Sequence, residues 1–178
     1  MIETPDLILK QAVFEDWQDL YFNVWRHPET ARYMLWDVTE SEEAARDRMR
    51  RTLRWQAEHP YFLDVYSKVA GRAIGYAGMQ EIAPGIWEEG GVALGPDYVG
   101  RGYGGQILDA LTQSAYSLGG LEFRASCREQ NERSHRLILS RGFQPVGSER
   151  CIDERNGEEY TLLHFVLRSP ASSGEDAC

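Results

Sequence analysis

A glycine-rich run near the middle of the chain has the residue types needed to bind an anion. It consists of Val99, Gly100, Arg101, Gly102, Tyr103, Gly104 and Gly105. Glycines let the backbone turn tightly and let a ligand approach it closely. The amphipathic pattern over residues 107–118 predicts a helix, whose first N–H groups and positive dipole end would face that ligand. The run therefore predicts a pyrophosphate site, to which Arg101 and Tyr103 could add side-chain contacts.

Two common phosphate-binding motifs do not fit this loop. A P-loop ends in Gly-Lys-Ser/Thr, whereas this loop ends in Gly104-Gly105-Gln106. A dinucleotide-binding motif has the spacing GxGxxG early in a βαβ unit, which Gly100, Gly102 and Gly104 do not reproduce. A glycine-rich turn without any ligand is the alternative interpretation, because short glycine motifs also match by accident.

The loop resembles the signature of the GNAT superfamily of N-acetyltransferases, Q/R-x-x-G-x-G/A at a strand–helix junction. Val99 replaces the leading Gln or Arg of that signature. Downstream, Asn131 and Ser134 followed by Gly142-Phe143 are similar to the N-x-x-S and G-F pattern of the subgroup that includes ribosomal-protein N-acetyltransferases. The resemblance covers about residues 4–167.

This resemblance implies a fold and an activity. The fold class would be α/β (α+β), with one domain over residues 1–168 and a mixed, mostly antiparallel central sheet flanked by helices. We expect residues 169–178 to form a disordered tail, because they are small and polar. The activity would be direct transfer of an acetyl group from acetyl-CoA, as co-substrate, to a primary amine.

Two alternatives to this activity stay open. Many members of the superfamily place a tyrosine acid where this chain has Ile138, and Val99 also departs from the signature. These differences would suit an acyl-CoA-binding module without catalysis. Transfer of a longer acyl group is the second alternative.

The resemblance also implies roles for single residues near the reacting atoms. Asn131 would contact the pantetheine arm, although an asparagine there would equally suit a helix N-cap. An N–H near Val92 or Leu94 would stabilise the oxyanion. The Ser134 hydroxyl would hydrogen-bond or protonate the leaving thiolate, or would simply lie on the surface of a first helical turn.

The attacking amine must lose a proton, and two glutamates are candidate bases. Glu122 lies on the predicted strand beside the loop, and Glu89 lies on the strand that leads into the loop. For each of them, a solvated glutamate on a strand face is the alternative. In a regular strand Glu88 points away from Glu89.

The acceptor amine is not readable from the sequence. A small molecule and a protein N-terminus both remain, because the acceptor pocket would be built from variable segments such as residues 25–37. The net charge of −9 excludes a basic nucleic-acid-binding face and weakly favours a cationic substrate.

Cysteine use and the termini indicate the compartment. Three widely spaced cysteines form no CxxC or Cys/His cluster, and the dispersed histidines form no HxH or HxxxH pair, so we expect no disulfide framework and no metal. The sequence has no export signal and no membrane-length apolar run, which predicts a cytoplasmic protein with no membrane partner. A homodimer stays open.

Alternating and helical periodicities supply the elements that must position these residues. His27-Pro28 ends the first helix, the second begins near Thr39 with Glu42 in a capping box, and Asn156-Gly157 joins the last two strands. The predicted strands are 7–10, 61–67, 72–82, 86–94, 121–127, 143–151 and 158–167, and the predicted helices are 14–26, 39–58, 104–118 and 131–140.

The three strands between residues 61 and 94 are joined by short turns, which predicts an antiparallel meander. Gly90 and Gly91 interrupt the third of these strands. Glycines inside a strand predict a bulge or a close backbone approach at that point.

Overall fold

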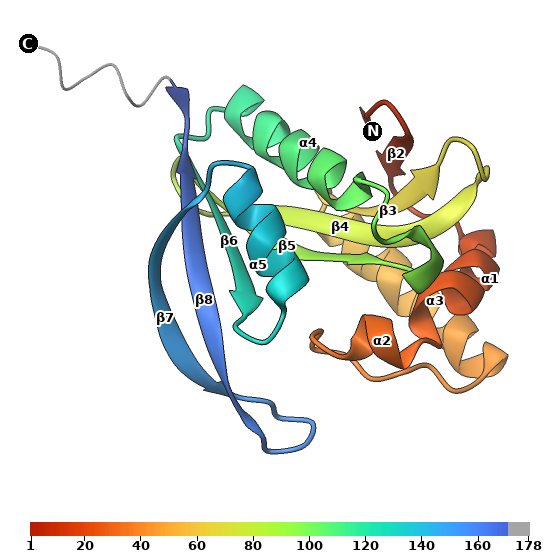
Figure 1. Cartoon of the computed structure of the whole chain (residues 1–178). Helices are drawn as coiled ribbons and strands as arrows, with labels where there is room; N and C mark the ends of the chain where they lie inside the picture. Colours follow the sequence, from red (N-terminus) through yellow and green to blue (C-terminus); the bar gives the residue numbers. More distant parts are fainter. Residues whose placement is uncertain (171–178) are drawn as a thin grey trace, which may run out of the picture. The chain divides into compact units, whose positions relative to one another are not determined.

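The computed structural model describes residues 1–170, and within them eight strands form one sheet (Figure 1). The strands are β1 (Ile2–Glu3), β2 (Leu7–Lys10), β3 (Phe62–Ser67), β4 (Arg72–Ala83), β5 (Ile86–Leu94), β6 (Glu122–Arg128), β7 (Gln144–Ile152) and β8 (Glu159–Arg168). Their order is β1-β2-β3-β4-β5-β6-β8-β7. β5 pairs with β6 in parallel, whereas the β1–β2, β2–β3, β3–β4, β6–β8 and β7–β8 pairs are antiparallel. The predicted mixed, mostly antiparallel sheet is confirmed.

The helices occupy the predicted regions. The first is a composite: a 3₁₀ turn (Phe14–Asp16), α1 (Trp17–Leu20) and a π-helical segment (Tyr21–Trp25). His27 is extended, with φ −95° and ψ 115°, and Pro28 starts a new short helix, so the predicted end at His27-Pro28 is confirmed. The helices that follow are α2 (Pro28–Ala31), α3 (Glu42–Glu58), α4 (Tyr103–Ser117) and α5 (Glu132–Ser140), with a 3₁₀ turn at Pro96–Tyr98 before α4.

The predicted start of the second helix at Thr39 is wrong by two residues. α3 is capped by Ser41, whose Oγ accepts a hydrogen bond from the N–H of Ala44 at 3.1 Å. Serine and threonine are both good N-caps, so the residue type alone did not decide between them. Thr39 is instead buried, and its hydroxyl accepts a hydrogen bond from Arg48 at 3.0 Å.

The chain divides into two compact units. The first comprises Met1–Gly78 and Gly90–Ala110, and the second comprises Met79–Glu89 and the chain from Leu111 onward. β4, β5 and α4 each run from one unit into the other. The residues that the sequence selects for chemistry fall in both units.

In the first unit, α3 and the composite helix pack on β3 and β4. Ala45 and Met49 lie four residues apart on one face of α3, and both are fully buried. The rest of α3 is mostly exposed, as its charged sequence predicts. The core cluster of this unit consists of Ala12, Trp17, Leu20, Val24, Trp25, Ala45, Met49, Tyr66 and Ala73.

In the second unit, α5 packs against β6, and β6, β8 and β7 lie side by side (Figure 1). Phe123 of β6 and Phe143 meet edge to face with ring centroids 6.2 Å apart. Ser169 is buried, and its N–H donates to the carbonyl of Leu121 at 2.9 Å, so the chain is anchored one residue beyond the predicted domain end. The prediction of a disordered tail falls almost entirely on residues 171–178, which lie outside the described residues.

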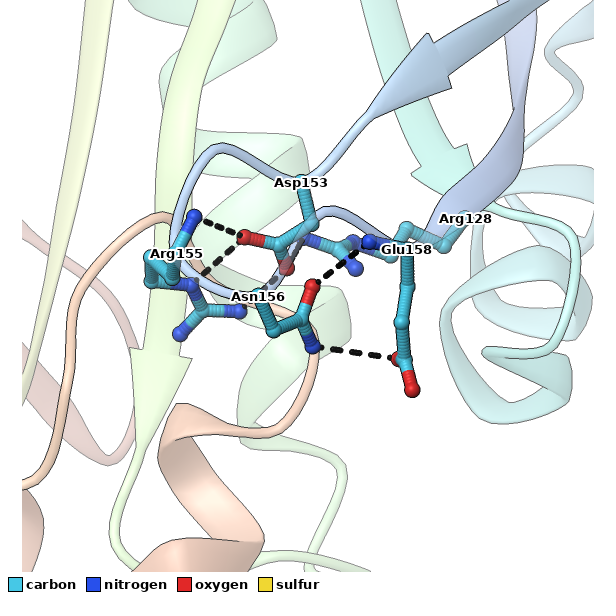
Figure 2. A network of polar contacts seen from close by, with 5 residues as sticks. All are labelled: Arg128, Asp153, Arg155, Asn156 and Glu158. Atoms are coloured by element: carbon cyan, nitrogen blue, oxygen red, sulfur yellow. Dashed lines mark hydrogen bonds and ion pairs between the residues drawn. The ribbon is translucent and has the colours of Figure 1, made fainter.

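The connection between β7 and β8 is held by a charged network that the sequence did not reveal (Figure 2). Asp153 is buried, and it accepts hydrogen bonds from Arg155 at 2.6 and 2.9 Å and from Arg128 of β6 at 2.8 Å. The two arginines, Arg155 most strongly, hold the pKa of Asp153 far below its usual range. The predicted turn residue Gly157 adopts φ +76° inside this connection.

Candidate functional site

The glycine loop has the backbone shape that an anion site requires. Gly100 and Gly102 have φ values of +78° and +80°, and no atom lies within 4 Å of a Cβ built at either of them. The first helical hydrogen bonds of α4 are donated by Gly105 and Gln106 to the carbonyl of Gly102. The N–H groups of Tyr103 and Gly104 therefore precede the hydrogen-bonded part of the helix.

The first turn of α4 is tied to the N-terminal segment through one side chain. The Gln106 carbonyl oxygen accepts from the Thr4 hydroxyl at 2.7 Å and from the Asp6 N–H at 3.2 Å. Its amide group donates to the Asp6 carboxylate at 2.6 Å. These contacts fix where the helix starts. Because Gln106 lies about a hundred residues from Thr4 and Asp6, no local sequence pattern predicts these contacts.

The two side chains expected to assist the loop differ in exposure. Arg101 is exposed, lies 5.7 Å from the Tyr98 ring centroid and donates from Nε to the Asp97 carbonyl at 3.1 Å. Tyr103 is buried, so it packs as part of the core. Arg101 is therefore better placed to meet a ligand.

The glycines of β5 allow close packing at the strand's centre. A Cβ at Gly90 would come within 2.4 Å of the Phe62 ring, which confirms the predicted close approach. Gly91 has φ +110°, and a Cβ there would lie 3.6 Å from the Tyr76 ring. Val92 and Leu94, the predicted oxyanion donors, follow directly and are half-buried.

In the second unit, the Ser134 side chain of α5 lies near the Cys127 thiol of β6. Burial raises the pKa of that thiol to about 11; the Ser134 side chain opposes that rise, and the charge of Glu89 adds to it. Glu89 is therefore close enough to act on Cys127. Three elements, β5, β6 and α5, each bring one polar group to this place.

Asn131 occupies the N-cap of α5. Its Oδ1 accepts a hydrogen bond from the N–H of Ser134 at 3.2 Å, so the capping interpretation is confirmed. A second role toward a ligand stays a prediction. Ile138, one turn beyond Ser134, is buried.

The two predicted bases lie in different surroundings. Glu122 begins β6, five residues before Cys127, and so belongs to the opposite face of that strand. Its carboxylate accepts a hydrogen bond from Arg124 at 2.7 Å and lies 3.8 Å from Arg168. Glu89 and Ser134 thus both act on Cys127, whereas Glu122 belongs to the other face of β6.

The first unit contains a cavity of about 810 Å³ beneath α3. Trp25, Trp36 and Asp37 line it, and these residues belong to the segment expected to build an acceptor pocket. Gly90 contributes to the lining from β5. The volume lies within the range of small-molecule sites.

The described part of the chain has neither a metal-ligating cluster nor a helix of membrane-spanning type. Among residues 1–170, no three His, Cys, Asp or Glu side chains are grouped as a metal site would need. In the same part of the chain, no helix has both the length and the apolar composition to cross a bilayer.

Comparisons with known proteins agree with these features. The family model described as an acetyltransferase (GNAT) domain matches residues 6–144. The uncharacterized N-acetyltransferase YoaA of Bacillus subtilis (strain 168) is 25% identical over 180 residues, covering 96% of this chain and 97% of YoaA.

Two solved structures show the same fold at low sequence identity. The putative acetyltransferase yncA from Salmonella typhimurium, with its cofactor acetyl-CoA, has a TM-score of 0.68 and 20% identity, covering 97% of this chain and 99% of its own. The acetyl transferase from Salmonella typhimurium that modifies the N-terminal serine of 50S ribosomal subunit protein L7/L12 has a TM-score of 0.76 and 17% identity. Its match covers 93% of this chain and 96% of its own.

Proposed function

Because this chain belongs to the GNAT acetyltransferase family, we propose that it transfers the acetyl group of acetyl-CoA to a primary amine by direct attack. The observation that carries this proposal is the glycine loop at the start of α4. Its open backbone at Gly100 and Gly102, with the leading N–H groups of Tyr103 and Gly104, fits a pyrophosphate. Acetyl-CoA supplies the activated acyl group.

The remaining loop residues have supporting roles in the proposal. Val99 and Gly105 complete the backbone around the phosphates, and Arg101 adds a positive charge. Asn131 contacts the pantetheine while it caps α5. The N–H groups of Val92 and Leu94 stabilise the charge that develops on the thioester oxygen.

Glu89 is the proposed general base. The amine nitrogen forms a bond to the acetyl carbonyl carbon, the carbon–sulfur bond breaks, and the amine loses one proton. Glu89 accepts that proton directly or through a water molecule. Its charge acts on Cys127, whereas Glu122 belongs to the opposite face of β6, and this supports the choice of Glu89.

Ser134 is the proposed group at the departing sulfur. Its hydroxyl donates a hydrogen bond or a proton to the thiolate as the carbon–sulfur bond breaks. A thiol with a pKa near 8.5–9 is a fair leaving group at neutral pH, so this help supplements a departure that is already feasible.

The proposal extends to the class of acceptor and to the cellular compartment. The acceptor is a small-molecule amine or a protein N-terminus, and the structural neighbour that acts on an N-terminal serine supports the second class. The free thiols of Cys127 and Cys151 suit a reducing compartment, the cytoplasm.

The experiment is an assay of the purified full chain with acetyl-CoA and a panel of amines. Release of free thiol, together with the mass of the acetylated amine, should report turnover. Gly102→Val should abolish it, while Gly71→Val should not, since Gly71 has a similar φ of +63° but lies in the β3–β4 turn. Tight acetyl-CoA binding without turnover of any amine would contradict the proposed enzyme.

A further inference from the structure

A half-buried arginine lines the cavity of the first unit. Arg48 of α3 lines the cavity, with its guanidinium carbon 4.7 Å from the ring centroid of Trp25 and 4.2 Å from that of Trp36. One of its nitrogens donates to the Thr39 hydroxyl at 3.0 Å. Thr39 is held in turn by its N–H, which donates to the Trp25 carbonyl at 2.9 Å.

Arg48 lacks the acidic partner that its neighbours on α3 possess. Arg46 pairs with Glu42 at 3.2 Å, and Arg50 pairs with Asp47 at 2.5 Å. Within residues 1–170, no carboxylate lies within ion-pair distance of Arg48. Charges withdrawn from water are usually paired, and this half-buried guanidinium lacks such a counter-charge.

The surroundings of Arg48 disfavour the charged form of its own guanidinium. Burial lowers the pKa of Arg48 to about 10; Tyr76 opposes that change, and the charge of Arg51 adds to it. A guanidinium between two aromatic faces keeps its planar fork of donors, which suits a carboxylate or a phosphate.

The acids that line the cavity do not neutralise this charge. Asp37 and Glu40 are exposed at its rim. Asp64 is buried, accepts from Gln56 at 3.0 Å and has a pKa raised to about 7 by burial, with the nearby charge of Asp16 adding to the rise. Asp64 is therefore partly protonated near neutral pH. The aromatic walls are Trp25, Trp36, Trp55, Phe62 and Tyr76.

The cavity is connected to the part of β5 expected to hold the acetyl group. The Trp36 indole donates to the Tyr76 hydroxyl at 2.7 Å, and Tyr76 lies beside Gly91. Gly90 lines the cavity itself. A molecule bound here could place one end near Arg48 and the other near the residues that precede Val92.

We propose that this cavity is the acceptor pocket, and that the acceptor is a small primary amine bearing a carboxylate or phosphate bound by Arg48. This inference rests on the proposed acetyl transfer, and it narrows the acceptor from any amine to an anionic one. The amine would enter from the β5 side, and the aromatic walls would hold the body of the molecule. The negative net charge of the chain does not oppose such an acceptor, because recognition is set by the local charge.

The test compares amines that share a skeleton and differ in the anionic group. Phenylalanine against 2-phenylethylamine tests the carboxylate, and phosphoethanolamine against ethanolamine tests the phosphate. The anionic member of at least one pair should have the higher kcat/KM, by about tenfold to a hundredfold. Arg48→Gln should remove that preference, so that the ratio of kcat/KM between the two members of the pair approaches one.

Two variants control for folding and for charge. Arg50→Gln removes an arginine from the exposed side of the same helix, so the preference should remain. Arg48→Lys keeps the positive charge but loses the planar set of guanidinium donors. The preference for the anionic amine should therefore fall without vanishing. Thermal unfolding establishes that the Arg48 variants are folded.

Other outcomes would overturn the inference. Equal kcat/KM within both pairs, unchanged by Arg48→Gln, would mean that the cavity recognises no anion. Faster acetylation of uncharged peptide N-termini would assign the pocket to a protein acceptor. Calorimetry with phenylalanine and phosphoethanolamine in the absence of acetyl-CoA measures anion binding independently of acetyl transfer. It therefore tests the anion site even if the protein transfers no acetyl group. Anion binding that depends on Arg48, without thiol release in the presence of any amine, would contradict the proposed acetyl transfer and support the anion site.

Discussion

The Ser134 side chain, in the first turn of α5, lies close enough to the Cys127 thiol, on the inner face of β6, to influence the pKa of that thiol. The pKa of the thiol is raised to about 11, mainly by burial, so Cys127 is neutral at physiological pH. The Asn131 cap fixes the backbone of Ser134 at the same time. The backbone of the serine is thus held in a defined position, from which its hydroxyl would assist a departing thiolate.

Ser134→Ala should lower kcat by about tenfold to a hundredfold and raise the acetyl-CoA KM much less. A hydrogen bond to a charged group is worth about 1.5–3 kcal/mol, and this one matters mainly as the thiolate forms. Cys127→Ala is the matched control, because it removes the neighbouring thiol and leaves the hydroxyl. Steady-state kinetics of both variants provide the measurement. Parallel losses in binding and rate would instead assign Ser134 to a ground-state contact or to the helix cap.

Glu89→Gln should depress kcat/KM most at low pH, by about 10²–10⁴-fold, and the deficit should shrink as the pH approaches the pKa of the amine. Above that pKa, about 10.4 for a lysine-like amine, the acceptor arrives neutral and needs no base. The measurement is kcat/KM for the amine as a function of pH, with acetyl-CoA at a saturating concentration.

Glu122→Gln is the control for this prediction. Glu122 is paired with Arg124 and lies on the other face of β6, so its loss should leave the pH profile unchanged. A loss confined to Glu122→Gln would move the base to β6. A deficit in Glu89→Gln that does not vary with pH would make Glu89 a structural residue.

Much of the fold could be predicted because its signals are local. The alternation in β3, β4 and β5 and the turn residues between them predicted the strand ends within about two residues. The two-residue strand β1 was missed, since Ile2-Glu3 is too short to show a period. The start of α3 was misplaced because Thr39 and Ser41 are both suitable caps, and the hydrogen bond between Thr39 and Arg48 is a tertiary contact.

The features of the candidate site also divide into those with a local sequence signal and those that depend on tertiary contacts. The glycine loop and the Asn131–Ser134 pair are short motifs, so the sequence predicted them directly. Three features depend on partners far along the chain: the anchoring of Gln106 by Asp6, the arginine pair around Asp153 and the aromatic rings against Arg48. No local pattern distinguishes Arg48 from the exposed arginines of α3, because its role comes from the aromatic rings that enclose it.

Gly102→Val should abolish CoA binding while the core stays folded. The residue has φ +80°, which a β-branched side chain resists, and the added methyl groups would occupy the open space above the loop. Calorimetric titration with CoA measures the loss. Gly71→Val carries a similar backbone strain in a turn remote in sequence, so it should keep the affinity. Unchanged affinity in a folded Gly102→Val protein would remove the loop from the site.

Asp64 should make the free energy of unfolding fall as the pH rises from about 4 to about 7. Burial, followed by the charge of Asp16, raises its pKa to about 7, against about 3.9 in an unfolded chain, while the hydrogen bond from Gln56 partly offsets the rise. Between these two values the folded state holds a proton that the unfolded state has released, so the folded state is favoured at the acid end of the window. Above pH 7 the contribution should be flat.

The measurement compares urea unfolding of the parent protein with that of Asp64→Asn across this window. Asparagine keeps an acceptor for Gln56 and has no titratable proton, so the difference between the two free energies of unfolding isolates Asp64. That difference should fall on the order of a few kcal/mol from about pH 4 to about pH 7, because the carboxylate becomes charged in a buried place. Asp47→Asn, at an exposed acid of α3, should show no comparable trend. A difference that stays constant with pH would mean that Asp64 is already ionised in the folded protein, and that the cavity beneath α3 holds a negative charge opposite Arg48.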